Sequence, residues 1–195
     1  KKRITDHTEK AYTSLYDYMT EVIDSVPAGA NGVIFTPWLH GNRCPFEDPN
    51  AAGMFFNINI NTGKSDMLRA VIEGVCYHLR WMLEAQDRKI KTSQTIRFVG
   101  GGALSDVTAQ ILADITGRTI EVVEKPQDVG AVGAAAIIGI GLGIIKDLGS
   151  VKNYIPVKKS FKPSTADKKV YDKNFEVFKK LYSSNKKNFQ MLNEQ

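Results

Sequence analysis

The chain has 195 residues, 43% of them hydrophobic and 24% charged, which excludes disordered and fibrous proteins and is long enough for one good core. The formal net charge of +5 is uneven: residues 146–195 hold 12 lysines against 5 acidic residues, and the rest hold 14 basic against 16 acidic residues. Solvated lysines on an exposed helix explain this basic segment better than nucleic-acid or lipid binding, so we predict neither partner.

No targeting segment or metal-binding pattern is visible. The chain starts with Lys1-Lys2-Arg3 and lacks an initiator Met and a cationic segment followed by an apolar run, so we interpret it as a piece of a longer chain. Cys44 and Cys76 are far apart, with neither a CxxC motif nor a His pair nearby. We therefore expect no metal ligands, no disulfide, and a cytoplasmic protein with reduced thiols.

The first half of the chain predicts two helices around a short strand. Apolar residues at helical spacing predict a helix over about 9–26, and an apolar run predicts a strand at 33–35. Residues 37–50 are rich in Pro, Asn and Gly and form a long irregular stretch, which is usually functional or interfacial. Apolar residues that share one helix face over 66–86 predict the second helix.

Residues 95–123 predict a β-α-β unit that contains a triple-glycine turn. A strand at 95–99 precedes Gly100-Gly101-Gly102, a helix follows from Ser105 to Gly117, and a second strand follows at 119–123. Glycine lets a ligand approach the main chain closely, and the helix N-terminus presents free N–H groups to it. By itself, the turn is equally typical of a tight corner and of a nucleotide cradle.

Residues 129–145 carry no charge, and five of the 17 are Gly and four are Ala. They are at the short limit for crossing a bilayer, so we expect a buried helix rather than a membrane span. The segment around Pro156 and Pro163 is linker-like, and a final helix is predicted over about 166–192. Its apolar stripe is predicted to pack on the rest of the domain: Tyr171, Phe175, Phe178, Tyr182, Phe189 and Leu192. The predicted organisation is a domain at 1–157 followed by a Lys-rich helical segment at 158–195.

Three ordered blocks resemble the FGGY carbohydrate kinases. The first is the glycine turn with its helix, GGGALSDVTAQILADITG at 100–117, followed after a strand by GAA at 133–135. The second spans 53–74 and is similar to the C-terminal signature of that family, and the third is FTPWLHGNRCP at 35–45. Two departures stand out: Asn57 where Gly is usual, expected to alter a turn beside the sheet, and Asn42 where Glu is common, which removes a charge near the domain interface.

The resemblance implies an α/β fold, an actin-like ATPase (ribonuclease-H-like) domain with a mixed sheet flanked by helices. It implies transfer of the γ-phosphoryl group of ATP, with Mg²⁺, to a sugar hydroxyl. The 35–43 stretch favours a xylulokinase-like member acting on a ketopentose such as xylulose. A gluconate or other polyol or sugar-acid kinase, and a non-catalytic scaffold or regulatory member, remain alternatives.

The family places its catalytic Asp in or beside the N-terminal domain, which also binds most of the sugar. No catalytic residue is therefore expected in these 195 residues, and the chain is not expected to turn over sugar alone. A homodimer is left open. His40 is not predicted to be a base; with Trp38 and Arg43 it lies in the long loop and could face the cleft or the absent domain.

The resemblance also implies a set of nucleotide-contacting residues. Gly100, Gly101 and Gly102 would lie against the α-phosphate, the ribose and one face of adenine. Ser105 is assigned to the same site, although its first expected role is to cap the helix. Asp106 would be repelled by phosphates and suits the adenine amino group or a ribose hydroxyl, with a favourable charge at the helix N-terminus as the alternative. Gln110 lies one turn further along and could only support the loop, and no metal ligand is predicted.

Overall fold

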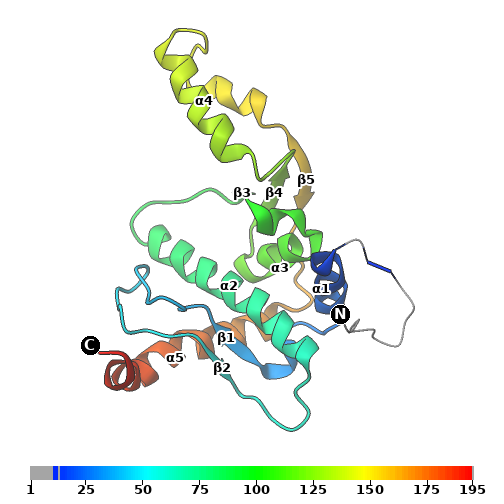
Figure 1. Ribbon diagram of the computed structural model, residues 1–195, viewed down its shortest axis with the longest axis vertical. Helices are drawn as coiled ribbons and strands as arrows, with labels where there is room; N and C mark the ends of the chain where they lie inside the picture. Colours follow the sequence, from blue (N-terminus) through cyan, green and yellow to red (C-terminus); the bar gives the residue numbers. More distant parts are fainter. Residues whose placement is uncertain (1–10, 13, 195) are drawn as a thin grey trace.

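The computed structural model describes residues 11, 12 and 14–194 (Figure 1). The helices are α1 (Leu15–Asp24), α2 (Lys64–Asp87), α3 (Asp106–Thr116), α4 (Val129–Gly141) and α5 (Lys168–Asn193). The strands are β1 (Ile34–Thr36), β2 (Met54–Phe56), β3 (Thr95–Phe98), β4 (Thr119–Val123) and β5 (Val157–Phe161). Three short 3₁₀ segments are η1 (Ala30–Gly32), η2 (Gly101–Leu104) and η3 (Leu148–Tyr154). The predicted start of the first helix, near residue 9, lies outside the described residues.

The strands form two small sheets. β1 and β2 pair antiparallel, with Phe35 opposite Phe55. The second sheet has the order β3-β4-β5, with β3 parallel and β5 antiparallel to β4. This mixed sheet flanked by helices agrees with the predicted α/β class.

Helix α2 lies at the centre of the molecule and contacts α1, α3, α5 and β1. Gly74 brings the α2 backbone directly onto β1, because a Cβ at this position would lie 2.1 Å from the carbonyl oxygen of Phe35. Ala70 and Tyr77 are buried on the same helix. Gly74 therefore sets how closely the helix and the first sheet approach.

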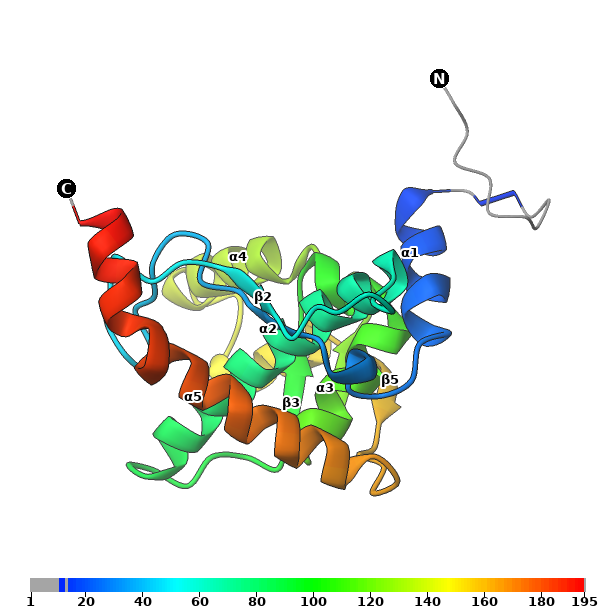
Figure 2. The ribbon, with the colours of Figure 1, turned by 90° about the horizontal axis from the view of Figure 1, so that it is seen from below.

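Helix α5 runs along the body and closes the core (Figure 2). In its aromatic stripe, Tyr171, Phe175, Phe178 and Phe189 are buried, whereas Leu192 is 81% exposed. Trp38 from the long loop contacts Phe178 with ring centroids 5.6 Å apart. Burial of large aromatic rings is the main stabilising term available here, so α5 fastens the loop 37–50 to the body.

A buried ion pair joins three helices. Arg69 Nε donates to Glu73 Oε1 over 2.7 Å, and the other guanidinium nitrogens donate to Ile23 O in α1 and to the Tyr171 hydroxyl in α5. Glu73 Oε1 also accepts from the Gly29 amide. Burial raises the pKa of the Glu73 carboxyl, and the hydrogen bond from Arg69 lowers it in part. The pair thus connects α1, α2, α5 and the turn before β1.

Two sequence predictions in the C-terminal half are wrong. The linker-like segment contains β5, which pairs with β4 and crosses the predicted boundary between residues 157 and 158; that boundary itself stays a prediction. The segment 129–145 was expected to be a buried helix, but α4 ends at Gly141 and only Ala136 and Gly139 are buried in it. With η3 it forms an arm that projects from the body (Figure 1).

None of the helices in the described part of the chain is both long and apolar enough to cross a bilayer. Strand β2 was not predicted either. It has three residues, too few for an alternating pattern to be recognised.

Replacing Arg69 with Met should lower the free energy of unfolding by about 3–5 kcal/mol, because the Glu73 carboxylate would stay buried without its counter-charge. Urea denaturation at neutral pH measures this. Lys168→Met is the control, since the Lys168 side chain is mostly exposed and its ion pair should be worth less than about 1 kcal/mol. A loss below about 1 kcal/mol for Arg69→Met would contradict the assigned role of the pair.

The stability contributed by Asp172 should disappear at acidic pH. Hydrogen bonds from Lys168 and then Arg80 hold the pKa of Asp172 below its ordinary value of 3.8. A carboxyl with a lowered folded-state pKa stabilises the fold above its unfolded pKa, and this contribution is lost as the pH falls through the folded-state pKa. The difference in unfolding free energy between wild type and Asp172→Asn should therefore narrow when the pH drops from neutral to below 3.8. A difference that does not change with pH would exclude this linkage.

Candidate functional site

The three positions after β3 are occupied by glycine for different structural reasons. Gly100 adopts φ +87°, ψ −172°, a conformation open almost only to glycine, and its amide donates to Pro126 O. Gly102 lies over Phe98, whose ring would be 3.1 Å from an added Cβ. At Gly101 φ is not positive, and an added Cβ would meet no atom within 4 Å. The backbone conformation therefore requires glycine at Gly100, and close packing on Phe98 favours it at Gly102. At Gly101 the backbone borders open space.

The N-terminus of α3 lies directly after this turn. Ser105 caps the helix as predicted: its Oγ accepts from the Thr108 amide over 3.2 Å. The Thr20 hydroxyl of α1 donates to the same oxygen over 3.4 Å. Asp106 is exposed in the first turn of α3, and its Oδ2 contacts Lys159 Nζ of β5 at 2.5 Å. The first backbone N–H groups of α3 and its partial positive charge lie at this end of the helix, directly after the turn.

Gln110 does not face the glycine turn with a free amide group. Its Nε2 donates to Asp114 Oδ1 over 2.8 Å and to Lys162 O over 2.9 Å. Asp114 Oδ1 also accepts from the Ser164 amide over 2.7 Å. Burial raises the pKa of the Asp114 carboxyl, although the hydrogen bonds that it accepts from Ser164 and Gln110 lower it in part. Both side chains thus fasten the segment after β5 to α3.

A shallow depression adjoins Ser105 between α1, α3 and β5. Its lining residues are Asp17, Thr20, Glu21, Asp24, Leu104, Ser105, Asp106, Val107 and Lys159. The acidic side chains on the α1 side repel a phosphate group. Their carboxylate oxygens can instead accept hydrogen bonds from hydroxyl and amino groups of a ligand. The open backbone at Gly101 and this acidic depression lie at the two ends of η2.

Two contributors to this region were not predicted. Lys159 was missed because β5 has the sequence VKKSF, which lacks an alternating apolar pattern and was interpreted as part of a linker. Thr20 lies on α1, 85 positions before Ser105, and nothing in its local sequence indicates that contact. Only the spatial arrangement brings either residue to α3.

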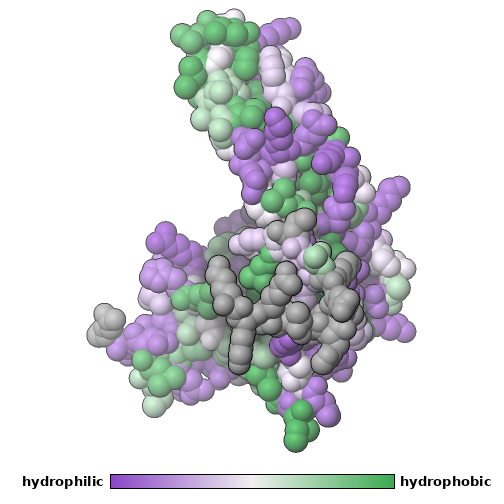
Figure 3. Space-filling model, turned by 45° about the vertical axis from the view of Figure 1, so that its right-hand side comes forward, coloured by the Kyte–Doolittle hydropathy of each residue, from purple (hydrophilic) through white to green (hydrophobic). Residues whose placement is uncertain are grey.

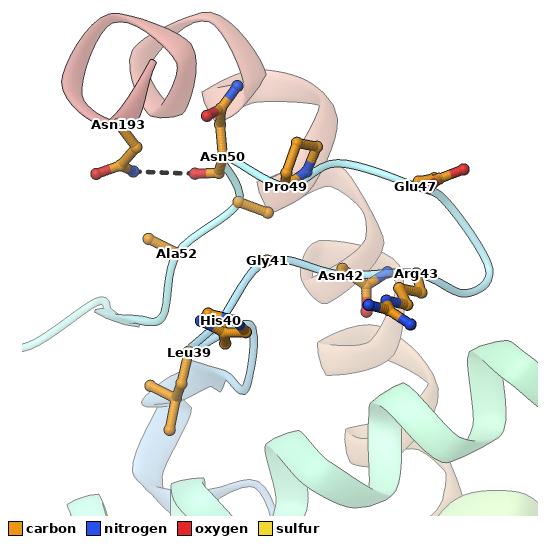
Figure 4. A pocket seen from close by; sticks show the side chains of 11 residues that line it. Leu39, His40, Gly41, Asn42, Arg43, Glu47, Pro49, Asn50, Ala52 and Asn193 are labelled. Atoms are coloured by element: carbon orange, nitrogen blue, oxygen red, sulfur yellow. Dashed lines mark hydrogen bonds between the residues drawn. The ribbon is translucent and has the colours of Figure 1, made fainter. Parts of the chain in front are cut away.

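The loop 37–50 forms a second depression, which Figure 4 shows from close by. His40, Arg43 and Glu47 line it, and Asn193 of α5 donates its amide to Asn50 O over 2.9 Å. His40 and Arg43 are solvent-accessible. Of Trp38, His40 and Arg43, the three loop residues expected to face the cleft, His40 and Arg43 are available to an external partner.

Trp38, by contrast, is buried and cannot face a cleft. Its indole N–H donates to His78 Nδ1 over 3.4 Å. Burial lowers the pKa of His78, which favours the neutral imidazole that this hydrogen bond requires.

The two departures from the family pattern have structural roles. Asn57 adopts φ +65° and its side-chain amide donates to Gly32 O over 3.1 Å. Asn is among the few residues that tolerate this left-handed conformation, so it can stand where glycine is usual. The Asn42 amide donates to Cys44 O and Phe46 O and so holds the loop together.

Within the described part of the chain, no group of three or more His, Cys, Asp or Glu side chains is arranged to hold a metal ion. The two thiols are free, with Cys76 buried and Cys44 exposed.

Replacing Ser105 with Ala should lower the free energy of unfolding by about 1 kcal/mol, because the Thr108 amide would lose its capping acceptor. Ser105→Asp should retain most of the stability, since aspartate is as good a cap. Thermal and urea denaturation of the three proteins measure this. If the Ser105→Asp protein were as unstable as the Ser105→Ala protein, helix capping would not be the reason for serine at this position.

Comparison with known proteins assigns the chain to a family. Residues 4–142 match the model of the C-terminal domain of the FGGY family of carbohydrate kinases. A xylulose kinase of Staphylococcus epidermidis is 33% identical over 172 residues, which is 88% of this chain and 34% of that protein.

Solved structures support the same family assignment. A ligand-bound xylulose kinase from Lactobacillus acidophilus matches with a TM-score of 0.81 and 27% identity, over 90% of this chain and 36% of the other. A gluconate kinase from the same species gives a TM-score of 0.77 and 28% identity, over 87% of this chain and 34% of the other. The chain thus spans about a third of the length of the relatives it matches. It belongs to the FGGY family of carbohydrate kinases, to which it corresponds as a C-terminal domain.

Proposed function

We propose that this chain is the nucleotide-binding domain of a sugar kinase that transfers the γ-phosphoryl group of ATP to a sugar hydroxyl. The observation that carries the proposal is Gly101. The fold gives no internal reason for glycine there, since a Cβ would meet nothing within 4 Å. A bare backbone in the turn before a helix suits a ligand with a flat face, such as a nucleotide.

The surrounding residues would each have one task. The backbone of Gly100 and Gly101 would lie against the nucleotide, with the phosphates directed away from the acidic depression at the N-terminus of α3. Asp106, beside the acidic depression, would accept from the adenine amino group or a ribose hydroxyl. Gly102, Ser105 and Gln110 would support the turn: Gly102 by packing on Phe98, Ser105 by capping α3, and Gln110 by its hydrogen bonds to Asp114 and Lys162.

Phosphoryl transfer requires positioning and charge neutralisation more than covalent chemistry from the protein. This chain would supply the nucleotide platform. A base for the attacking hydroxyl, most sugar contacts and any Mg²⁺ ligands would come from the remaining kinase polypeptide. The chain alone is therefore expected to bind nucleotide without turning over sugar.

The proposed acceptor is a ketopentose such as xylulose. The support is the 35–43 stretch and the names of the relatives, which include xylulose kinases from two genera. The alternative is gluconate or a related polyol or sugar acid, because a gluconate kinase has a nearly equal structural match. A scaffold member that binds no nucleotide is the other alternative. A cytoplasmic location stays a prediction.

Replacing Gly101 with Val should weaken Mg-ATP binding by at least about tenfold, or about 1.4 kcal/mol, because the side chain would fill the space that the nucleotide needs. The melting temperature should change little, since a Cβ at this position meets no atom within 4 Å. Isothermal titration calorimetry and thermal unfolding measure the two effects.

Gly117→Val is the matched control. Gly117 also has open space around it but adopts φ +67° at the far end of α3. Its replacement should lower stability and leave nucleotide affinity unchanged. Unchanged affinity in Gly101→Val would show that the nucleotide lies elsewhere. A wild-type chain that binds no nucleotide, even when joined to the rest of a kinase, would favour the scaffold alternative.

A further inference from the structure

A single histidine makes the polar contacts between helix α2 and the loop 37–50. His78 of α2 accepts a hydrogen bond at Nδ1 from the indole N–H of Trp38, over 3.4 Å. The same imidazole hydrogen-bonds to the backbone of Cys44. Within the described residues, the hydrogen bonds between this loop and α2 all involve His78. One titratable group therefore joins the loop to the central helix.

Trp38 is the residue that this contact holds in place. Its ring packs against Phe46 of the loop and against Phe178 and Tyr182 of α5, with centroid separations of 5.4, 5.6 and 5.8 Å. Apolar residues that reach the surface gather over the end of the arm (Figure 3), whereas Trp38 is 1% exposed. The indole is thus almost entirely removed from water, and its N–H depends on His78 as acceptor.

The contact requires a neutral imidazole. In the neutral ring one nitrogen accepts and the other donates, whereas both nitrogens donate once the ring is protonated. The indole N–H is a donor only, so protonation of His78 places two donors opposite each other. The Cys44 carbonyl can still accept from the ring. The Trp38 N–H, however, is left without a partner in a buried position, which is unfavourable.

The surroundings of His78 do not favour its charged form. Burial lowers the pKa of the imidazole from its ordinary value of 6.5, and the hydrogen bond to Cys44 raises it in part. The charged and titratable side chains of the packed elements are paired with one another or exposed: Asp48 with Tyr182, Lys179 with Glu84 and Glu176, and the exposed His40, Arg43, Cys44 and Glu47. Among the described residues, none of these side chains shifts the pKa of His78.

We propose that His78 is a pH switch for the loop 37–50. While the imidazole is neutral, it holds Trp38 against α2 and α5. When the imidazole is protonated, this contact is lost and the first half of the loop moves away from α2. The depression that His40 and Arg43 line then changes its shape, so the surface that the loop offers to an external partner depends on pH. The switch does not involve the glycine turn and can hold whether or not the chain binds a nucleotide.

The sign of the linkage sets the pH window. A histidine whose folded-state pKa lies below its unfolded value binds fewer protons in the folded state, so its contacts weaken as the pH falls. The contribution of His78 is complete above its ordinary pKa of 6.5 and is lost as the pH falls through 6.5 towards the folded-state pKa. Release of the loop should therefore have its midpoint below pH 6.5.

The test measures how accessible Trp38 is to the quencher acrylamide. The chain has two tryptophans, so a Trp81→Phe background leaves Trp38 as the emitting residue. The quenching constant should rise at least about twofold between neutral pH and about pH 5, because a nearly buried indole becomes accessible. Far-UV circular dichroism should stay unchanged over the same range, which separates release of the loop from unfolding of the domain.

His78→Gln is the decisive variant, because the glutamine carbonyl can accept from the indole and does not titrate. Its quenching constant should be as low at acidic pH as it is in the wild-type background at neutral pH. His40→Gln is the matched control. His40 is an exposed histidine of the same loop, so its replacement should leave the pH response of Trp38 intact.

A second measurement does not depend on the folding of the glutamine variant. NMR titration of His78 in the wild type and in Trp38→Phe compares the two midpoints. Removal of the indole donor should raise the midpoint towards 6.5, since protonation then breaks no hydrogen bond to the loop. An unchanged midpoint would show that the contact between Trp38 and His78 does not control the protonation.

Three further outcomes would overturn the proposal. The first is a quenching constant that does not change with pH. The second is the same acid-induced rise in His78→Gln as in the background protein. The third is loss of the helical signal at the same pH, which would identify unfolding of the whole domain. Nucleotide titration at neutral pH is a separate readout, so failure of the nucleotide proposal is distinguishable from failure of this one.

Discussion

The buried contact between Arg69 and Glu73 is the constraint on which the rest of the structure depends. Both groups lie on α2, but their remaining bonds go to α1, to α5 and to the turn at Gly29. An ion pair removed from water gains little net stability over an apolar pair. Its effect is directional, because the planar guanidinium donates to acceptors at fixed angles and so orients these elements on α2.

This arrangement reaches the glycine turn through α1. Arg69 holds the C-terminal end of α1 at Ile23 O, and one turn earlier Thr20 contacts Ser105 at the start of α3. On the other side, Gln110 and Asp114 tie α3 to the segment that leads from β5 into α5. The start of α3 is therefore positioned from two directions by elements distant in sequence. A site that tolerates little displacement benefits from such support.

The sequence predicted the features that depend on local pattern. The apolar spacing of α2, the cap at Ser105 and the glycine at the end of α3 each follow from a few neighbouring residues. What escaped prediction depends on distant partners. β5 is a strand because β4 offers it backbone partners, although its own residues are mostly Lys and Ser. The partner of Asp106 was missed with it. The exposure of α4 could not be predicted either, because its composition alone is typical of a covered helix.

The positions of the aromatic residues have a consequence for spectroscopy. The chain contains two tryptophans, and both are packed against α5: Trp38 and Trp81 lie 5.6 Å and 6.1 Å from the ring of Phe178. Neither lines the depression beside α3. Intrinsic fluorescence therefore reports whether α5 is docked. A quench during titration with a ligand would indicate movement of the C-terminal helix, whereas a ligand lying against the glycine turn would leave the emission unchanged.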